Sequence, residues 1–405
     1  MGENSKDKMN LFKVSAFKRK LIIFNSGEDF FKIPSLETSG QIVIKRQNRV
    51  EKDNFLANGN TLNQFSIFVV VMLLRKILFP FSLLYALAIR IRNYLYDSGI
   101  KKAKVFETKI VCIGNLSVGG TGKTPMAEYL IKSFKDDFRV ALLSRGYKRK
   151  SNGFILADAQ STVESLGDEP FQIHLKFPEI TVAVDADRRN GIALLEKLVN
   201  PDIILLDDAF QHRKVKAGFN ILLTAHGKLY CDDWYLPTGN LRDSKREANR
   251  ADLIVVTKCP STISEAERKS IVDKLKPNVN QQVLFSTLKY NDRLYGINGS
   301  VTLTDLKEKK VTLVTGIADA TPLVEHLGLE GLSFEHLEYS DHHFFSEKEL
   351  KDLNNRELVL TTEKDYVRLK NALHSLHYIT IQQEFIGNDA NRLSEALRGL
   401  MTQDS

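Results

Sequence analysis

Residues 109–134 read KIVCIGNLSVGGTGKTPMAEYLIKSF, and this stretch decides the fold. Residues 109–115 are rich in isoleucine and valine, which is typical of a strand buried on both faces of a parallel sheet. A glycine-rich loop follows, and the apolar residues of 126–134 have the spacing of an amphipathic helix. Strand, glycine-rich loop and helix in this order form the phosphate-binding unit of P-loop proteins. The sequence therefore predicts an α/β domain that binds a nucleoside triphosphate.

The loop departs from the usual pattern GxxxxGK[ST] at one position, because Ser117 stands where the first glycine is expected. The glycines let backbone N–H groups turn towards phosphates, and Lys123 can reach the β- and γ-phosphates. The hydroxyl of Thr124 can bind Mg²⁺. The predicted nucleotide-binding residues are Ser117, Val118, Gly119, Gly120, Thr121, Gly122, Lys123 and Thr124.

Strands and helices continue to alternate along the chain. Apolar strands are predicted within residues 139–146, 179–188, 201–210, 219–225 and 251–258. Short polar strands around residues 282–301 interrupt the pattern, and a second alternation occupies residues 310–383. We predict a P-loop NTPase-like parallel sheet with helices on both faces, plus a second, smaller α/β domain.

Acidic residues lie at two places that matter for phosphate chemistry. Asp207 and Asp208 follow an apolar strand, where P-loop proteins hold Mg²⁺. Asp168 and Glu169 belong to a GDEP motif, which by itself predicts only a turn with a carboxylate that caps the next helix. A kinase also needs a carboxylate that accepts the proton of the acceptor hydroxyl.

Other polar groups have more than one interpretation. Asp341, His342 and His343 fit a carboxylate–imidazole pair, half of a metal site or a polar strand end. Arg145 and Arg188 follow predicted strands at the edge where open α/β sheets bind ligands, and arginine suits phosphate recognition. The alternative for both arginines is a solvated surface.

The net charge of +7 suits nucleic acid, anionic lipid or a phosphorylated substrate. Because no basic run is interleaved with aromatic residues, we expect no nucleic-acid partner. The three cysteines form no CxxC pair, which argues against a disulfide framework or a zinc site.

Residues 67–89 are the most apolar segment of the chain, but Arg75, Lys76 and Pro80 interrupt it. Basic residues follow at positions 90–104, so the segment suits a helix that lies in the headgroup region of an anionic membrane. A buried core helix is the alternative.

The motifs together resemble one family. GNLSVGGTGKTP, LLSRGYKR, GDEP, VDADR, LDDAFQHR, LPTGNLR, DHHFF and TTEKD occur in this order. This set is similar to that of the tetraacyldisaccharide 4'-kinases, which make a lipid A precursor in Gram-negative bacteria. The resemblance covers residues 73–400, and the run LLYALAIRIRNYLYDSGIKK is similar to the family's membrane-associated helix.

The resemblance implies transfer of the γ-phosphate of ATP, with Mg²⁺, to the 4'-hydroxyl of a tetraacyl glucosamine disaccharide 1-phosphate. It implies that Asp168 is the base, working with His342, and that Lys123 assists transfer. Arg145 and Arg188 would lie near phosphate and substrate. The residues that would hold or orient Mg²⁺ are Thr124, Glu169, Asp207 and Asp208. The expected location is the cytoplasmic face of the inner membrane, with peripheral or monotopic attachment to its anionic surface and no obligate protein partner.

The expected organisation has five parts. These are an N-terminal extension (1–65), a membrane-associated helical segment (66–105), a P-loop kinase domain (106–285), linker strands (286–302) and a C-terminal α/β domain (303–405). A P-loop GTPase or metal-cluster chaperone is the runner-up, although Thr257, Lys258, Cys259 and Pro260 match a guanine-reading motif only in part. A nucleotide-gated membrane adaptor is a third possibility.

Overall fold

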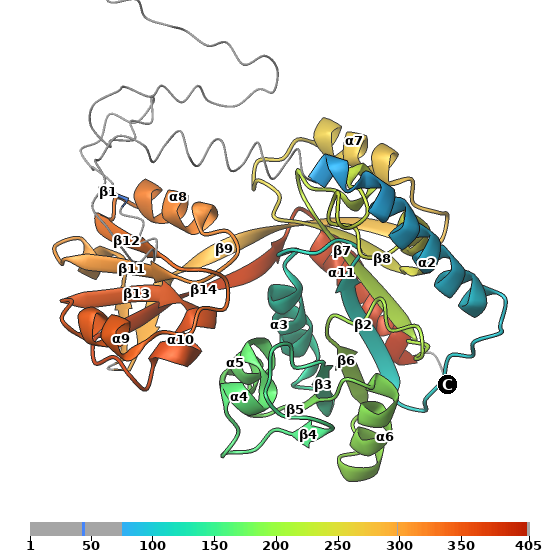
Figure 1. Cartoon of the computed structure of the whole chain (residues 1–405), viewed down its shortest axis with the longest axis horizontal. Helices are drawn as coiled ribbons and strands as arrows, with labels where there is room; N and C mark the ends of the chain where they lie inside the picture. The colour runs from blue at the N-terminus through green and yellow to red at the C-terminus, as the bar shows by residue number, and fades with distance from the viewer. Residues whose placement is uncertain (1–42, 45–74, 298, 403–405) are drawn as a thin grey trace, which may run out of the picture.

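The computed structural model describes residues 43–44, 75–297 and 299–402. Figure 1 shows two α/β units connected by the long strands β9 (Gln282–Gly296) and β14 (Leu376–Phe385). Apart from the two-residue strand β1 (Val43–Ile44), the predicted N-terminal extension lies outside the described residues. Residues 66–74 of the predicted membrane segment lie outside them too.

The first unit contains a parallel sheet in the order β8-β7-β2-β6-β3-β5, with β4 antiparallel at its edge. Its strands are β2 (Lys109–Asn115), β3 (Val140–Ser144), β4 (Ile155–Leu156), β5 (Thr181–Val184), β6 (Ile203–Leu206), β7 (Phe219–Ala225) and β8 (Leu253–Thr257). Its helices are α2 (Phe79–Asp97), α3 (Lys123–Phe134), α4 (Val163–Leu166), α5 (Asp168–Lys176), α6 (Arg188–Leu198) and α7 (Glu265–Leu275).

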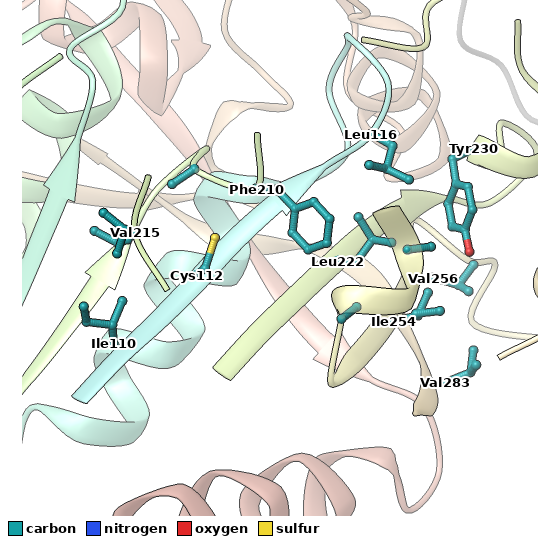
Figure 2. Packing of buried hydrophobic residues seen from close by; sticks show 14 of the residues in the cluster. Ile110, Cys112, Leu116, Phe210, Val215, Leu222, Tyr230, Ile254, Val256 and Val283 are labelled. Carbon is teal, nitrogen blue, oxygen red and sulfur yellow. The ribbon is translucent and has the colours of Figure 1, made fainter. Parts of the chain in front are cut away.

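Both faces of this sheet are buried, as its apolar strands predict. Ile110 and Cys112 belong to the apolar cluster on one face, and Val111 and Ile113 to the cluster on the other. Figure 2 shows the first cluster, with Phe210 lying close to β2. A Cβ atom on Gly114 would lie only 2.6 Å from Cβ of Phe210, so this strand position requires glycine. The P-loop NTPase-like sheet predicted from the sequence is confirmed.

The second unit repeats the pattern on a smaller scale, in the order β12-β11-β13-β14 with parallel pairing. Its remaining strands are β10 (Gly299–Thr302), β11 (Val311–Thr315), β12 (Phe334–Glu338) and β13 (Leu358–Thr362). Its helices are α8 (Thr321–Leu329), α9 (Glu347–Asn354) and α10 (Glu363–Leu369). Apolar clusters again cover both faces of the sheet.

Strand β9 connects the two sheets, although the sequence suggests two short polar strands there. Residues 282–285 pair in parallel with β8, and residues 286–296 pair antiparallel with β14. A register shift between Ile379 and Ile381 lets β14 follow β9 from one unit to the other. The last helix, α11 (Asp389–Thr402), returns to the first unit, where Leu393 and Leu397 join its core.

Candidate active site

The phosphate loop lies between β2 and α3, as predicted. Gly119 and Gly122 have φ angles of +120° and +85°, which glycine adopts easily and other residues do not. Gly122 is the N-cap of α3, and the unpaired N–H groups at the start of a helix favour an anion. The N–H of Val118 donates to the carbonyl of Asn240 at 2.8 Å. The eight predicted residues therefore form a braced loop suited to a phosphate chain.

Two basic residues hold Asp208, which follows β6. Lys123 Nζ lies 3.8 Å from Asp208 Oδ1. Arg242 donates to both carboxylate oxygens of Asp208, at 3.0 Å from Nη1, and also to the side chain of Asn115. Burial acts to raise the pKa of Asp208, but Arg242 and Lys123 outweigh it and the pKa is lowered. Asp208 is therefore ionised and holds the side chains of both Lys123 and Arg242.

Asp207 is buried beside Asp208 and has one oxygen without a partner. Its Oδ2 accepts a hydrogen bond from Ser144 Oγ at 3.1 Å, whereas Oδ1 has no hydrogen-bond partner among the described residues. Burial, followed by the negative charges of Glu169 and Asp208, raises the pKa of Asp207 to about 7. A buried, partnerless carboxylate oxygen near other carboxylates is a suitable ligand for a divalent cation.

The predicted metal residues do not make a complete protein cage. Within residues 75–297 and 299–402, no group of three or more His, Cys, Asp or Glu side chains could hold a metal ion. Asp207 offers its free oxygen and Thr124 lies in the first turn of α3, while Asp208 is occupied by Arg242. Mg²⁺ is usually held by one or two protein ligands, substrate phosphates and water. The donor set therefore fits Mg²⁺ that arrives with a nucleotide.

Asp168 contacts residues of the second unit. It is buried as the first residue of α5, and its carboxylate accepts hydrogen bonds from His342 and Arg368. Arg368 Nε lies 2.8 Å from Asp168 Oδ1. Burial acts to raise the pKa of Asp168, but the two donors outweigh it and the pKa is lowered. The structure thus brings Asp168 and His342 together, and adds an arginine that the sequence analysis did not identify.

The neighbours of His342 select one tautomer of its ring. Lys364 Nζ lies 3.2 Å from His342 Nε2, and an ammonium group can only donate, so Nε2 must accept. The proton is therefore on Nδ1, which faces Asp168. Lys364 is held in turn by Asp341, at 3.3 Å. His342 is thus placed as a hydrogen-bond donor that orients the Asp168 carboxylate.

Asp208 follows the carboxyl end of β6, an inner strand of the first sheet, and Asp168 begins α5. Glu169, next to Asp168, is close enough to raise the pKa of Asp207, and Lys123 is close enough to oppose that effect. The start of α5, the end of β6 and the phosphate loop therefore lie near one another. This is the arrangement that phosphate transfer from a bound nucleotide requires.

The two predicted arginines differ in their surroundings. Arg145 is exposed after β3. Arg188 is buried as the first residue of α6, and it donates to the carbonyl oxygens of Asp185 at 3.0 Å and Asp207 at 3.4 Å. Burial lowers the pKa of Arg188. Arg188 therefore braces the backbone beneath the carboxylates, and Arg145 is the more accessible of the two.

Three basic residues of the site were missed from the sequence: Arg242, Lys364 and Arg368. Lys364 and Arg368 lie four residues apart in α10, so they share one face of the helix. That spacing was a readable signal beside the TTEKD motif. Arg242 ends the LPTGNLR motif, but the motif does not show its partner, because Asp208 lies 34 residues away in the chain.

Helix α2 has its polar face inward and its apolar face outward, the reverse of an ordinary surface helix. Ser82 Oγ donates to Thr238 Oγ1 at 2.8 Å, and Asn93 Nδ2 donates to Asp243 Oδ1 at 2.9 Å. The residues of α2 that are more than half exposed include Phe81, Leu83, Leu84, Leu87, Ile91 and Tyr94, and Ile77 just before the helix is exposed too. No helix in the described ranges is long and apolar enough to cross a membrane.

A tryptophan from another part of the chain extends the apolar face. The ring of Trp234 is 60% exposed and lies 5.6 Å from the ring of Phe79, in an edge-on arrangement. Exposed basic residues lie before the helix at Arg75, within it at Arg90 and after it at Lys101. A row of outward apolar side chains bordered by cations suits an anionic lipid surface better than water.

Comparison with known proteins gives one consistent family. The family described as Tetraacyldisaccharide-1-P 4'-kinase matches residues 74–402. A protein of Flavobacterium johnsoniae named tetraacyldisaccharide 4'-kinase is 51% identical over 325 residues, which cover 79% of this chain and 95% of that protein. A protein of the same name from Bacteroides thetaiotaomicron is 39% identical over 359 residues, covering 82% of this chain and 94% of that one.

A solved structure shares the fold. It is the crystal structure of the "apo" form of LpxK from Aquifex aeolicus in complex with ATP. The similarity covers 81% of this chain and 99% of that chain, with a TM-score of 0.68 and 31% sequence identity.

Proposed function

Because the chain belongs to the tetraacyldisaccharide 4'-kinase family, we propose that its phosphate loop and the Asp168 group carry out the family's reaction. The chain is a kinase that phosphorylates the 4'-hydroxyl of a tetraacyl glucosamine disaccharide 1-phosphate with ATP, a step of lipid A biosynthesis. The observation that best supports the assignment of the site is that Lys123 and Glu169 both lie close enough to Asp207 to shift its pKa, which puts the phosphate loop, the end of β6 and the start of α5 around one region of space. A nucleotide on the loop would have its γ-phosphate in that space.

In the proposed reaction, Asp168 accepts the proton of the 4'-hydroxyl. The oxygen forms a bond to the γ-phosphorus while the bond from that phosphorus to the bridging oxygen breaks, and ADP leaves with the electron pair. Lys123 offsets charge on the phosphate oxygens. His342 donates from Nδ1 to Asp168 and keeps its carboxylate oriented. Most of the rate acceleration would come from positioning and electrostatics, as in other phosphoryl transfers.

Mg²⁺ would be held by Asp207 and Thr124, with Glu169 close to Asp207. A bound divalent cation would supply neutralisation of phosphate charge. Asp208 would act on Lys123 and Arg242 rather than on the cation directly. Arg145 is the accessible candidate for a substrate phosphate, and Arg188 supports the site from below.

The acyl chains of the acceptor would stay in the membrane that α2 contacts. We propose peripheral attachment to the cytoplasmic face of the inner membrane, with α2 and Trp234 in the headgroup region and no obligate protein partner. We also propose that residues 106–285 and 303–405 act as two catalytic units joined by β9. Helix α11 lies in the second range but packs on the first unit, so it strengthens the junction.

The test is phosphate transfer from ATP to purified tetraacyl disaccharide 1-phosphate, followed by mass analysis. The expected product is heavier by one phosphate group, located on the non-reducing sugar at the 4' position. A product carrying phosphate elsewhere, or ATP hydrolysis without any lipid product, would contradict the proposal. Competition with GTP separates this kinase from the alternative P-loop classes.

A further inference from the structure

Arg368 makes further contacts besides its ion pair with Asp168. Its Nε and Nη2 donate to the two oxygens of Asp168, and its Nη1 donates to the carbonyl of His343 at 2.7 Å. Its guanidinium also lies over the ring of Phe344, 5.0 Å from the ring centre. The side chains of Arg368 and Asp168 are 7% and 3% exposed. A planar arginine fork fixed at four points can hold a carboxylate in one plane.

The hydrogen bonds of Asp168 leave little of its carboxylate free. A carboxylate has about four acceptor positions. Arg368 fills two of them and His342 fills a third. Asp168 and Arg368 also line a pocket whose walls include Tyr147 and Phe344. About one acceptor position therefore remains for a hydroxyl group that enters the site.

We propose that Arg368 is a positioning residue for phosphate transfer: it orients Asp168 so that the remaining acceptor position faces the acceptor hydroxyl. This inference rests on the proposed function, because it assumes that Asp168 is the base. It assigns Arg368 a part in the reaction although Arg368 itself takes no proton. It also means that both units contribute to the function of the base, because Asp168 begins α5 and Arg368 lies in α10.

A second ion pair between the same two helices provides the control. Lys176, at the end of α5, lies 2.8 Å from Glu363, at the start of α10. This pair joins the two units as the Asp168–Arg368 pair does, but it lies at the opposite ends of both helices. Loss of docking between the helices would follow from breaking either pair. Loss of base positioning would follow only from removing Arg368.

The experiment compares Arg368→Met, Arg368→Lys and Glu363→Gln, with ATP and the tetraacyl disaccharide 1-phosphate both varied. We expect Arg368→Met to lower kcat about 100-fold while KM for ATP changes less than about twofold. Arg368→Lys should recover part of the loss, because one ammonium group restores charge but cannot bridge both oxygens. Glu363→Gln should keep kcat close to that of the unsubstituted enzyme.

A double substitution then tests whether Arg368 acts through Asp168. Asp168→Ala combined with Arg368→Met should be no slower than Asp168→Ala alone. Multiplied losses, an unchanged or higher kcat for Arg368→Met, or an equal loss for Glu363→Gln would each overturn the inference. If Arg368→Met does not fold, Arg368→Lys carries the same test. An unsubstituted enzyme that transfers no phosphate to the lipid refutes the proposed function, and the inference with it.

Discussion

The site contains two aspartate–arginine pairs, and they differ in where their partners come from. Asp208 and Arg242 are 34 residues apart and lie in the same unit. Asp168 and Arg368 are 200 residues apart and come from different units. The residues described for the proposed nucleotide half of the site therefore all belong to the first unit. The acceptor half exists only where α5 meets α10, so the two halves should respond differently to substitution.

The largest expected effect separates the two halves through binding. Lys123→Ala and Asp168→Ala should each lower kcat by about 10³-fold, because one removes phosphate stabilisation and the other removes the base. Only Lys123→Ala should also weaken ATP binding, as measured by titration with a fluorescent ATP analogue. Turnover close to that of the unsubstituted enzyme in either variant would reject its role. Weakened ATP binding in Asp168→Ala would break the distinction between the halves.

The next effect concerns the cation. Asp207→Asn should raise the Mg²⁺ concentration needed for half-maximal rate by about 10- to 100-fold, because it replaces the free carboxylate oxygen with a neutral group. Calorimetric titration of Mg²⁺ with ATP present provides a second measurement that does not depend on turnover. Asp273→Asn, at an exposed position of α7, is the matched control. An unchanged Mg²⁺ requirement in Asp207→Asn would place the cation elsewhere.

A third, smaller effect concerns the lipid side. Leu84→Asp should lower binding to vesicles that contain anionic lipid by at least about tenfold, since burial of a leucine contributes about 1.5–3 kcal/mol. Leu329→Asp is the control, because Leu329 is also exposed, at 69%, but lies at the end of α8. Sedimentation with vesicles measures both. Equal losses in the two variants would show a general effect of charge rather than docking through α2.

The smallest effect concerns stability at the junction of the two units. Lys176 lies between Glu128 and Glu363, at 2.8 Å from each, so one cation serves two carboxylates. Burial, followed by the charge of Glu363, raises the pKa of Glu128 from 4.5 to about 7. The raised pKa means that the folded state binds the proton more tightly, so this contribution to stability is full below about pH 4.5 and disappears as the pH rises through about 7.

Glu128→Gln should therefore flatten the dependence of Tm on pH between about 4.5 and 7, by about 2–4 °C for each kcal/mol involved. Thermal unfolding across that range, compared with the unsubstituted enzyme, measures the change. Parallel curves for the two proteins would show that folding does not raise the pKa of Glu128.

The difference between the two pairs also explains what the sequence could predict. The phosphate loop and Asp207 belong to contiguous patterns, so residue types and spacing predicted where they lie, before α3 and after β6. The interpretation of Asp168 from local sequence was a capping turn, because its partners are supplied by a distant helix. The sequence suggested two short strands in place of β9 because only residues 283–286 are buried without interruption. Beyond them, buried and exposed residues no longer alternate regularly where the strand passes between the units. Arg368 lies four residues after Lys364, which indicates one face of a helix, but no local feature of the sequence shows which residues that face contacts.

Contacts between α2 and the segment after β7 give α2 a second role besides the proposed attachment to the membrane. Tyr85 donates to the carbonyl of Arg242 at 3.1 Å, and Asn93 holds the adjacent Asp243, while the side chain of Arg242 holds Asp208. Truncating the chain before β2 would therefore remove a support of Arg242 and Asp208 along with the proposed lipid contact. A water-soluble form suited to inhibitor screening should instead keep α2 and replace only its outward apolar side chains.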